Sequence, residues 1–145
     1  MRKEFQQRLL RHINFLEIEI EDYTKFKGLR KKEYITDRDK RRSVERWVEN
    51  IINSSVDISK IILLLEDINL PDSYKEIVAS VSAVEDLSTV EAEALSNWVK
   101  FRNIVTHEYL DIRWASIRKF IDQTNPLYKN FLEKIKGYLE KRLQT

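Results

Sequence analysis

Apolar residues recur at helical spacing through most of the chain, and this period predicts its main helices. The first predicted helix runs from about residue 2 to residue 27, and Gly28 provides its stop. The second begins at Thr36 or Asp37 and runs to about Asp67. At about 30 residues it would be ~45 Å long, the dimension of a bundle spine. Its broad, mostly apolar stripe comprises Val44, Trp47, Val48, Ile51, Ile52, Ser55, Ile58, Ile62 and Leu65.

Turn and capping signals place the next two helices. Asn69-Leu70-Pro71-Asp72 closes the second helix, and a short helix is expected from Ser73 to about Val81. Ser88 and Glu91 have the spacing of a capping box, in which the hydroxyl caps backbone N–H groups and the carboxylate reaches back. The helix that this box opens has a core stripe of Ala94, Leu95, Trp98, Phe101 and Val105.

Two more helices complete the C-terminal part. Asp111 is expected to cap a helix that runs through Phe120, and Asn125-Pro126 is a start signal for the last helix. The boundary between them, from Gln123 to Pro126, could be either a break or a kink in one helix.

Composition agrees with this pattern and narrows the fold class. The 145 residues include only two glycines and two prolines, which predicts an all-α, up-and-down bundle of four or five main helices. We expect one domain over residues 1–145. The absence of cysteine excludes disulfides and thiolate chemistry. The longest aliphatic run, Ile61 to Leu65, is far too short to span a membrane, so we expect a cytoplasmic protein.

The segment from Phe101 to Tyr109 holds the candidate chemistry. It places Arg102, Asn103, His107 and Tyr109 within eight residues. If residues 98 to 109 form one helix, Arg102 and Tyr109 share one stripe, whereas Asn103 and His107 share the adjacent stripe. Arg102 and His107 would then point about 140° apart. Either the helix unwinds near Thr106, or a second copy of the chain completes the site across a two-fold axis.

An arginine beside a histidine can cut RNA without a metal ion or another cofactor, and we expect neither here. A histidine titrates near neutral pH, so His107 could take a proton from the RNA 2′-hydroxyl or give one to the leaving oxygen. Arg102 would hold the phosphate and stabilise the developing charge. Asn103 would orient His107 or bind substrate. On spacing alone a structural explanation also suffices: His107 would favour a helix C-terminus and Tyr109 would pack.

The wider sequence resembles a known family. Arg102-Asn103-Ile104-Val105-Thr106-His107-Glu108-Tyr109 resembles the Arg-x4–6-His signature of HEPN domains, and more closely the Arg-x4-His-x-Tyr form of HepT toxins. Val44-Glu45-Arg46, the stretch from Leu70 to Glu76, and Leu110-Asp111-Ile112 also resemble that family. The resemblance covers roughly Thr36 to Ile135. Thr106 departs from the small or apolar residue that commonly precedes the motif histidine.

This resemblance implies a homodimer in which Arg102 and His107 line the dimer cleft. It also implies a metal-independent endoribonuclease toxin whose substrate is RNA. The implied partner is an antitoxin of the MNT type, a minimal nucleotidyltransferase. Such a partner uses ATP to transfer AMP to the motif tyrosine, here Tyr109, and thereby silences the toxin.

Two other functions compete with this one. An inactive HEPN module could dock on a nucleotidyltransferase without cutting RNA, or the chain could be a purely structural helical dimer. The net charge of +2 does not decide between them. From Lys25 to Arg46 the chain has ten Lys or Arg against four Asp or Glu, and this basic segment could be a solvated helix face or could attract phosphates.

Overall fold

The computed structural model describes residues 3–84, 87–106 and 109–144, and these residues contain helices but no strand. The helices are α1 (Lys3–Glu21), α2 (Tyr23–Phe26), α3 (Lys31–Thr36), α4 (Arg38–Leu65), α5 (Tyr74–Ser80), η1 (Val81–Ala83), α6 (Thr89–Trp98), η2 (Val99–Thr106), α7 (Leu110–Gln123) and α8 (Asn125–Gln144). The labels η1 and η2 mark 3₁₀ helices. The all-α prediction is therefore confirmed.

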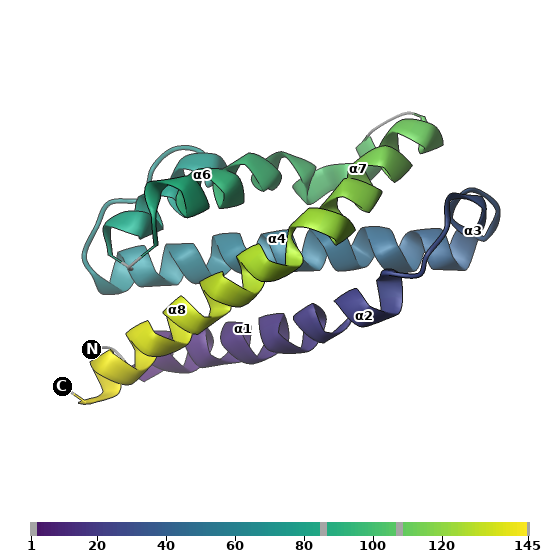
Figure 1. Ribbon diagram of the computed structural model, residues 1–145. Coiled ribbons are helices and arrows are strands. Elements are labelled where there is room, and N and C mark those ends of the chain that lie inside the picture. Colours follow the sequence, from purple (N-terminus) through teal and green to yellow (C-terminus); the bar gives the residue numbers. More distant parts are fainter. Residues whose placement is uncertain (1–2, 85–86, 107–108, 145) are drawn as a thin grey trace.

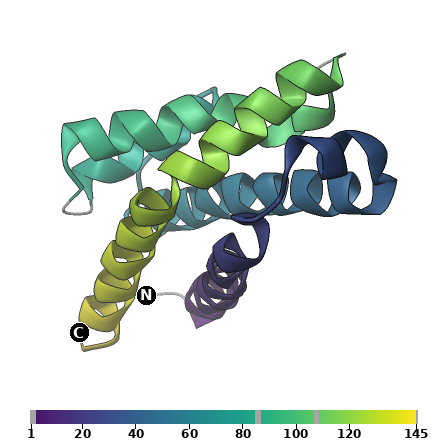
Figure 2. The same cartoon turned by 45° about the vertical axis from the view of Figure 1, so that its right-hand side comes forward.

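The chain runs up and down along α4, as predicted (Figure 1). α1 leads toward α3, α4 returns, α6 and η2 run outward again, and α7 with α8 return to the end where the chain starts. Figure 2 shows the same order from a second direction, with the N and C termini at neighbouring positions. The spine α4 is thus packed among three further runs of helix: α1, α6 with η2, and α7 with α8. No helix among the described residues is long and apolar enough to cross a membrane.

The spine α4 is a long helix without a break, and its buried apolar residues are spread along most of its length. Asp37 caps it, and its carboxylate accepts hydrogen bonds from the backbone N–H groups of Asp39 and Lys40 at 3.1 Å. Trp47 lies at the centre of an aromatic cluster, with ring centroids 4.7 Å from Tyr23 and 5.6 Å from Phe120. This cluster joins α2, α4 and α7, and so fixes the end of the bundle near the candidate site.

Three predicted boundaries need correction. The first predicted helix breaks at Asp22. The short helix α2, of four residues, follows the break and ends before the turn at Gly28. The segment from Lys31 to Thr36 forms α3, a helix that is too short to be recognised from apolar periodicity. Asp111 lies in the first turn of α7 and is not its cap; Tyr109 occupies that position without a side-chain hydrogen bond.

Two other predicted boundaries agree with the structure. The Ser88 capping box forms as expected: Ser88 Oγ accepts the Glu91 N–H at 3.1 Å. Between α7 and α8 only Thr124 separates the two helices. Its hydroxyl donates to the Phe120 carbonyl at 2.6 Å and lies 2.5 Å from the Tyr23 hydroxyl. The C-terminal arm is therefore two helices joined by a buried one-residue break.

Candidate active site

The described part of the motif, from Arg102 to Thr106, lies in a distorted turn and not in the α-helix expected over residues 98 to 109. The α-helix ends at Trp98, and η2 continues as a 3₁₀ helix with non-helical dihedral angles at Asn103 (φ −122°, ψ 58°). The Thr106 hydroxyl donates to the Asn103 carbonyl at 2.8 Å. Polar side chains that bond to nearby backbone groups compete with the helical ladder, and this bond closes η2 at its last residue.

The predicted stripe shared by Arg102 and Tyr109 is consequently wrong. Tyr109 lies outside η2 in extended backbone (φ −97°, ψ 129°), so it does not share a helix face with Arg102. The sequence allowed for unwinding near Thr106, and the distortion begins three residues earlier, at Asn103. His107 lies outside the described residues, and its predicted pairing with Arg102 stays a prediction.

A carboxylate from α4 supports the distorted turn. The Glu49 carboxylate faces the backbone N–H groups of Ile104 and Val105, just after the kink, and these two groups act to lower its pKa. Burial raises the pKa of the Glu49 carboxyl, and the charge of Glu45, one turn earlier on α4, raises it further. The side chain of Ile104 is buried against the core, so this turn is held from both its backbone and its apolar side.

The Arg102 side chain is half-buried and lies against an aromatic ring. Its guanidinium carbon is 4.1 Å from the centroid of the Tyr74 ring, at the first residue of α5. Its Nε is buried without a hydrogen-bond partner in the structure. A planar guanidinium held on a ring in this way has lost rotational freedom and still has N–H groups to donate to an anion.

The remaining site candidates are accessible. Asn103 is exposed on η2. Tyr109 has 66% of its surface exposed, which makes its hydroxyl available for modification. The structure therefore places Arg102 and Asn103 on one turn and Tyr109 at the start of the following helix, α7.

A buried ionic network fixes the far side of the motif. Glu45 is 5% exposed and accepts hydrogen bonds from the Tyr34 hydroxyl at 2.5 Å and from Arg113 at 2.8 Å. These contacts join α3, α4 and the first turn of α7, which follows Tyr109. Glu45 belongs to a segment that resembles the family but has no role assigned by that resemblance, and Glu49 lies outside the predicted apolar stripe. The signal that could have identified both is a pair of carboxylates four residues apart, beside the apolar stripe of α4.

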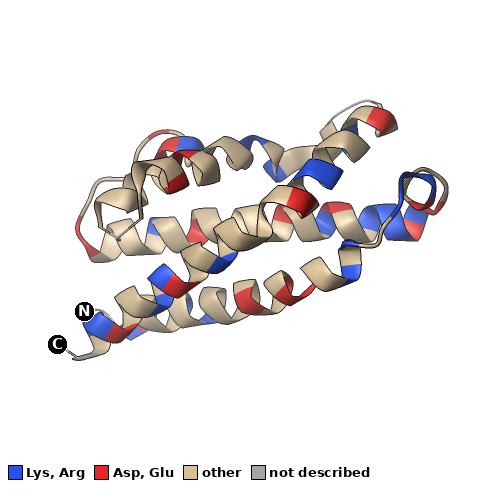
Figure 3. Ribbon diagram, in the orientation of Figure 1, with Lys and Arg blue, Asp and Glu red and all other residues tan. Residues whose placement is uncertain are grey.

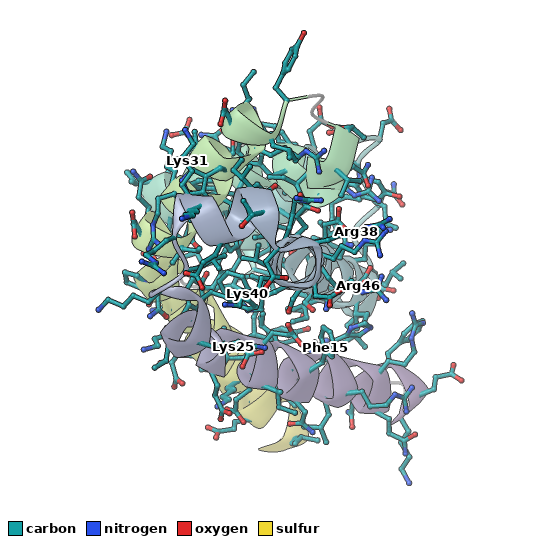
Figure 4. The ribbon with its side chains drawn as sticks, turned by 90° about the vertical axis from the view of Figure 1, so that its right-hand side faces the viewer. Phe15, Lys25, Lys31, Arg38, Lys40 and Arg46 are labelled. Atoms are coloured by element: carbon teal, nitrogen blue, oxygen red, sulfur yellow. The ribbon has the colours of Figure 1, made fainter. Side chains whose placement is uncertain are left out.

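The basic segment from Lys25 to Arg46 lies at the same end of the bundle (Figure 3). Figure 4 shows Lys31, Arg38, Lys40 and Arg46 together on this end. Part of the charge is neutralised within the chain: Lys40 bonds Glu33 at 2.6 Å and Lys31 lies 3.3 Å from Asp111. Another part of this segment borders the motif. An open groove of about 510 Å³ lies there, and it is lined by Asp39, Arg42, Ser43, Glu45, Arg46, Glu49 and Val105.

Among the described residues, no group of three or more His, Cys, Asp or Glu side chains is arranged to hold a metal ion. The polar groups available at the site are those of a guanidinium, an amide and a phenol, with carboxylates behind them. Such a set suits the binding of a phosphate from its exposed side.

Comparisons with known proteins agree with this fold and point to one family. The family model described as "Ribonuclease HepT-like" matches residues 16–135. A crystal structure of a mutant of the toxin–antitoxin MntA–HepT has a TM-score of 0.78 at 16% identity, over 89% of this chain and 97% of that chain. A crystal structure of a toxin–antitoxin with AMP-PNP has a TM-score of 0.76 at 16% identity, over the same shares. At this identity the structures show the same fold. No individual curated protein matches.

Proposed function

Since the chain belongs to the HepT-like ribonuclease family, we propose that it is the ribonuclease toxin of a toxin–antitoxin pair. In this proposal it cuts RNA without a metal ion through Arg102 and His107. The observation that supports it most directly is Arg102 itself. Its guanidinium is positioned on Tyr74 beside a kinked, accessible turn, and no carboxylate of the described residues pairs with it. An arginine needed only for stability would be expected to have such a partner.

The reaction is a transesterification within the RNA strand. The 2′-oxygen attacks the adjacent phosphorus, the bond to the 5′-oxygen breaks, and the products are a 2′,3′-cyclic phosphate and a 5′-hydroxyl. One imidazole takes the proton from the 2′-hydroxyl and one returns a proton to the 5′-oxygen. Arg102 donates to the phosphate oxygens as charge develops on them, and Asn103 binds the substrate or orients His107.

Two proton transfers on opposite sides of one phosphorus suit two histidines better than one. We therefore propose a two-fold homodimer in which the motif turns of the two copies face the same cleft. Each copy would supply Arg102 and His107, and one His107 would act as the base while the other acts as the acid.

The partner in this proposal is a nucleotidyltransferase antitoxin. The similar structures are described as toxin–antitoxin complexes, one of them with the ATP analogue AMP-PNP. The antitoxin would transfer AMP to Tyr109: the phenol oxygen attacks the α-phosphorus of ATP and pyrophosphate leaves. The exposure of Tyr109 at the start of α7 supports this assignment, because a transferase must reach the hydroxyl.

RNA cleavage by the purified chain in EDTA tests the proposal, with His107→Ala as the variant and the intact mass recorded. We expect the wild type to cut and His107→Ala to remain folded and inactive. Failure to cut by unmodified wild-type protein, across several classes of RNA, would contradict the ribonuclease proposal and favour a docking module. A mass excess of one AMP in an inactive sample would direct the experiment to Tyr109.

A further inference from the structure

Tyr74 has two cations against its ring. Arg102 lies 4.1 Å from the ring centroid, and the Lys60 ammonium lies 4.5 Å from the same centroid. The three side chains come from three elements, η2, α5 and α4. Tyr74 is 38% exposed, so the cluster lies at the surface. We call Lys60 and Arg102 the cation pair on Tyr74.

The backbone around Tyr74 is held in place. Ser73 caps α5, and its hydroxyl oxygen accepts the Glu76 N–H at 3.1 Å. Because Tyr74 is the first residue of that helix, the cap holds the backbone from which its ring projects. Lys60 lies on the spine α4, the longest helix of the described chain. Two of the three side chains therefore project from well-anchored backbone.

Neither cation has a negative partner in the part of the chain that the structure describes. Asp57 lies one turn before Lys60 on α4, and Glu76 lies on the same helix as Tyr74, but no ion pair joins either carboxylate to Lys60 or Arg102. Both cations thus lie against one ring with no carboxylate to balance them, and an aromatic ring compensates only part of the charge of a cation. An anion bound beside them would supply the missing balance.

Two other arginines that lie against rings have a carboxylate partner, whereas no ion pair joins Arg8, 5.7 Å from the Phe5 ring centroid, to a carboxylate of the described residues. Arg118 lies 5.9 Å from the Trp114 ring centroid and pairs with Asp122 at 2.6 Å. Arg142 lies 5.7 Å from the Tyr138 ring centroid and pairs with Glu66 at 3.1 Å. Those contacts are balanced within the protein. Among the described residues, the cation pair on Tyr74 differs from the other ring contacts because it places two cations without a carboxylate on one ring, and at the shorter distances. This arrangement points to an external anion.

We propose that Lys60 is a substrate-binding residue that holds an RNA phosphate next to the one that Arg102 contacts. Tyr74 is the positioning residue that keeps the two cationic groups together. This inference rests on the proposed ribonuclease function and adds the path of the RNA strand to it. The strand leaves the scissile phosphate along the surface between α5 and α4. Lys60 touches a phosphate that does not react, and so contributes binding without taking part in the bond-breaking step.

Salt dependence distinguishes a phosphate contact from a structural role. Binding of single-stranded nucleic acid weakens with salt at a logarithmic slope of about −0.7 for each phosphate neutralised. The assay is the fluorescence anisotropy of a labelled 2′-O-methyl RNA, which keeps the phosphates and cannot be cut. We expect Lys60→Gln to make the slope about 0.7 shallower. Lys129→Gln, which removes the same charge from an exposed site on α8, should leave the slope unchanged.

Steady-state cleavage gives a second readout. Loss of a contact that is equal in the bound substrate and the transition state raises KM and leaves kcat unchanged. We expect this pattern for Lys60→Gln. Tyr74→Leu should lower both RNA affinity and kcat, because Arg102 loses its ring as well, and Tyr74→Phe should recover most of that loss. Thermal melting followed by circular dichroism confirms that each variant is folded.

The outcomes separate this inference from the function on which it rests. If the wild type binds RNA and Lys60→Gln keeps the wild-type slope and KM, the Lys60 contact is contradicted and the ribonuclease proposal stands. If the wild type binds RNA without cutting it, the ribonuclease proposal fails. The change in the salt slope of RNA binding in Lys60→Gln then decides whether Lys60 contacts a phosphate. If the wild type does not bind RNA at all, both are overturned.

Discussion

Removing the Glu45 carboxylate should destabilise the bundle more than any single surface substitution. Glu45 is 5% exposed and is the acceptor for both Tyr34 and Arg113, whose side chain is only 17% exposed. Glu45→Ala would leave a guanidinium and a phenol without their partner in a poorly hydrated place. Removing one partner of a buried ion pair costs about 3–5 kcal/mol. Because Arg113 retains some access to water, we expect the lower end, about 3 kcal/mol.

Urea unfolding followed by circular dichroism measures the loss of free energy, and thermal unfolding followed in the same way measures the loss of Tm. In a chain of this size, each kcal/mol lowers Tm by about 2–4 °C, so Glu45→Ala should melt roughly 10 °C lower than the wild type. The control is the double variant Glu45→Ala with Arg113→Met, which removes both charges and keeps most of the apolar volume. It should be more stable than Glu45→Ala alone, because no unpaired charge remains.

Two results would refute this reasoning. If Glu45→Ala unfolds within about 1 kcal/mol of the wild type, the network contributes no more than an exposed ion pair. If the double variant is less stable than the single one, the cost of Glu45→Ala comes from lost packing and not from an unpaired Arg113. Either result would also remove the reason for regarding this network as the support of the first turn of α7.

Three further predictions concern the surroundings of the motif. Glu49→Ala removes the carboxylate that the N–H groups of Ile104 and Val105 face, so hydrogen exchange at these two amides should quicken while α8 keeps its wild-type rates. Unchanged exchange at both amides would contradict the contact. Hydrogen bonds from Lys40 and then Arg30 lower the pKa of Glu33 from 4.5 to about 2, so its contribution to stability is present above pH 4.5 and is lost as the pH falls toward 2. Glu33→Gln should therefore unfold at lower urea than the wild type near neutral pH, with the difference shrinking over that acid range; a difference that is constant with pH would refute the linkage. With the antitoxin and ATP, the wild type should gain the mass of one AMP. Tyr109→Phe should gain none and should still cut RNA, and AMP on this variant would place the modification on another residue.

The fold was predictable because its information lies in long periodic segments. The apolar stripe of α4, its Asp37 start and the Ser88 capping box all act within one helix, where sequence spacing and geometry correspond directly. The short helix α3 is different. It is held by the buried Tyr34 and its bond to Glu45, a contact across eleven positions that no local pattern contains.

The candidate site was predictable in its residues and not in its geometry. Arg102, Asn103 and Tyr109 stood out by chemical type. The turn is kinked at Asn103 and faces Glu49 of α4, more than fifty positions away, and helical spacing, which contains neither fact, placed Tyr109 on the wrong face. The ring beneath Arg102 likewise comes from another element, and Tyr74 drew attention only as part of a resembling segment.

The ends of the RNA fragments test the central claim most directly. A pool of RNA is incubated with the purified chain in EDTA, and the same sequences made with 2′-O-methyl groups are treated in parallel. If Arg102 and His107 direct attack by the 2′-oxygen, mass spectrometry should find 2′,3′-cyclic phosphate on the upstream fragments and 5′-hydroxyl on the downstream ones. The 2′-O-methyl RNA should stay intact, and Arg102→Ala and His107→Ala should each abolish the products. Fragments with 5′-phosphate ends, or cutting of the 2′-O-methyl RNA, would contradict this mechanism.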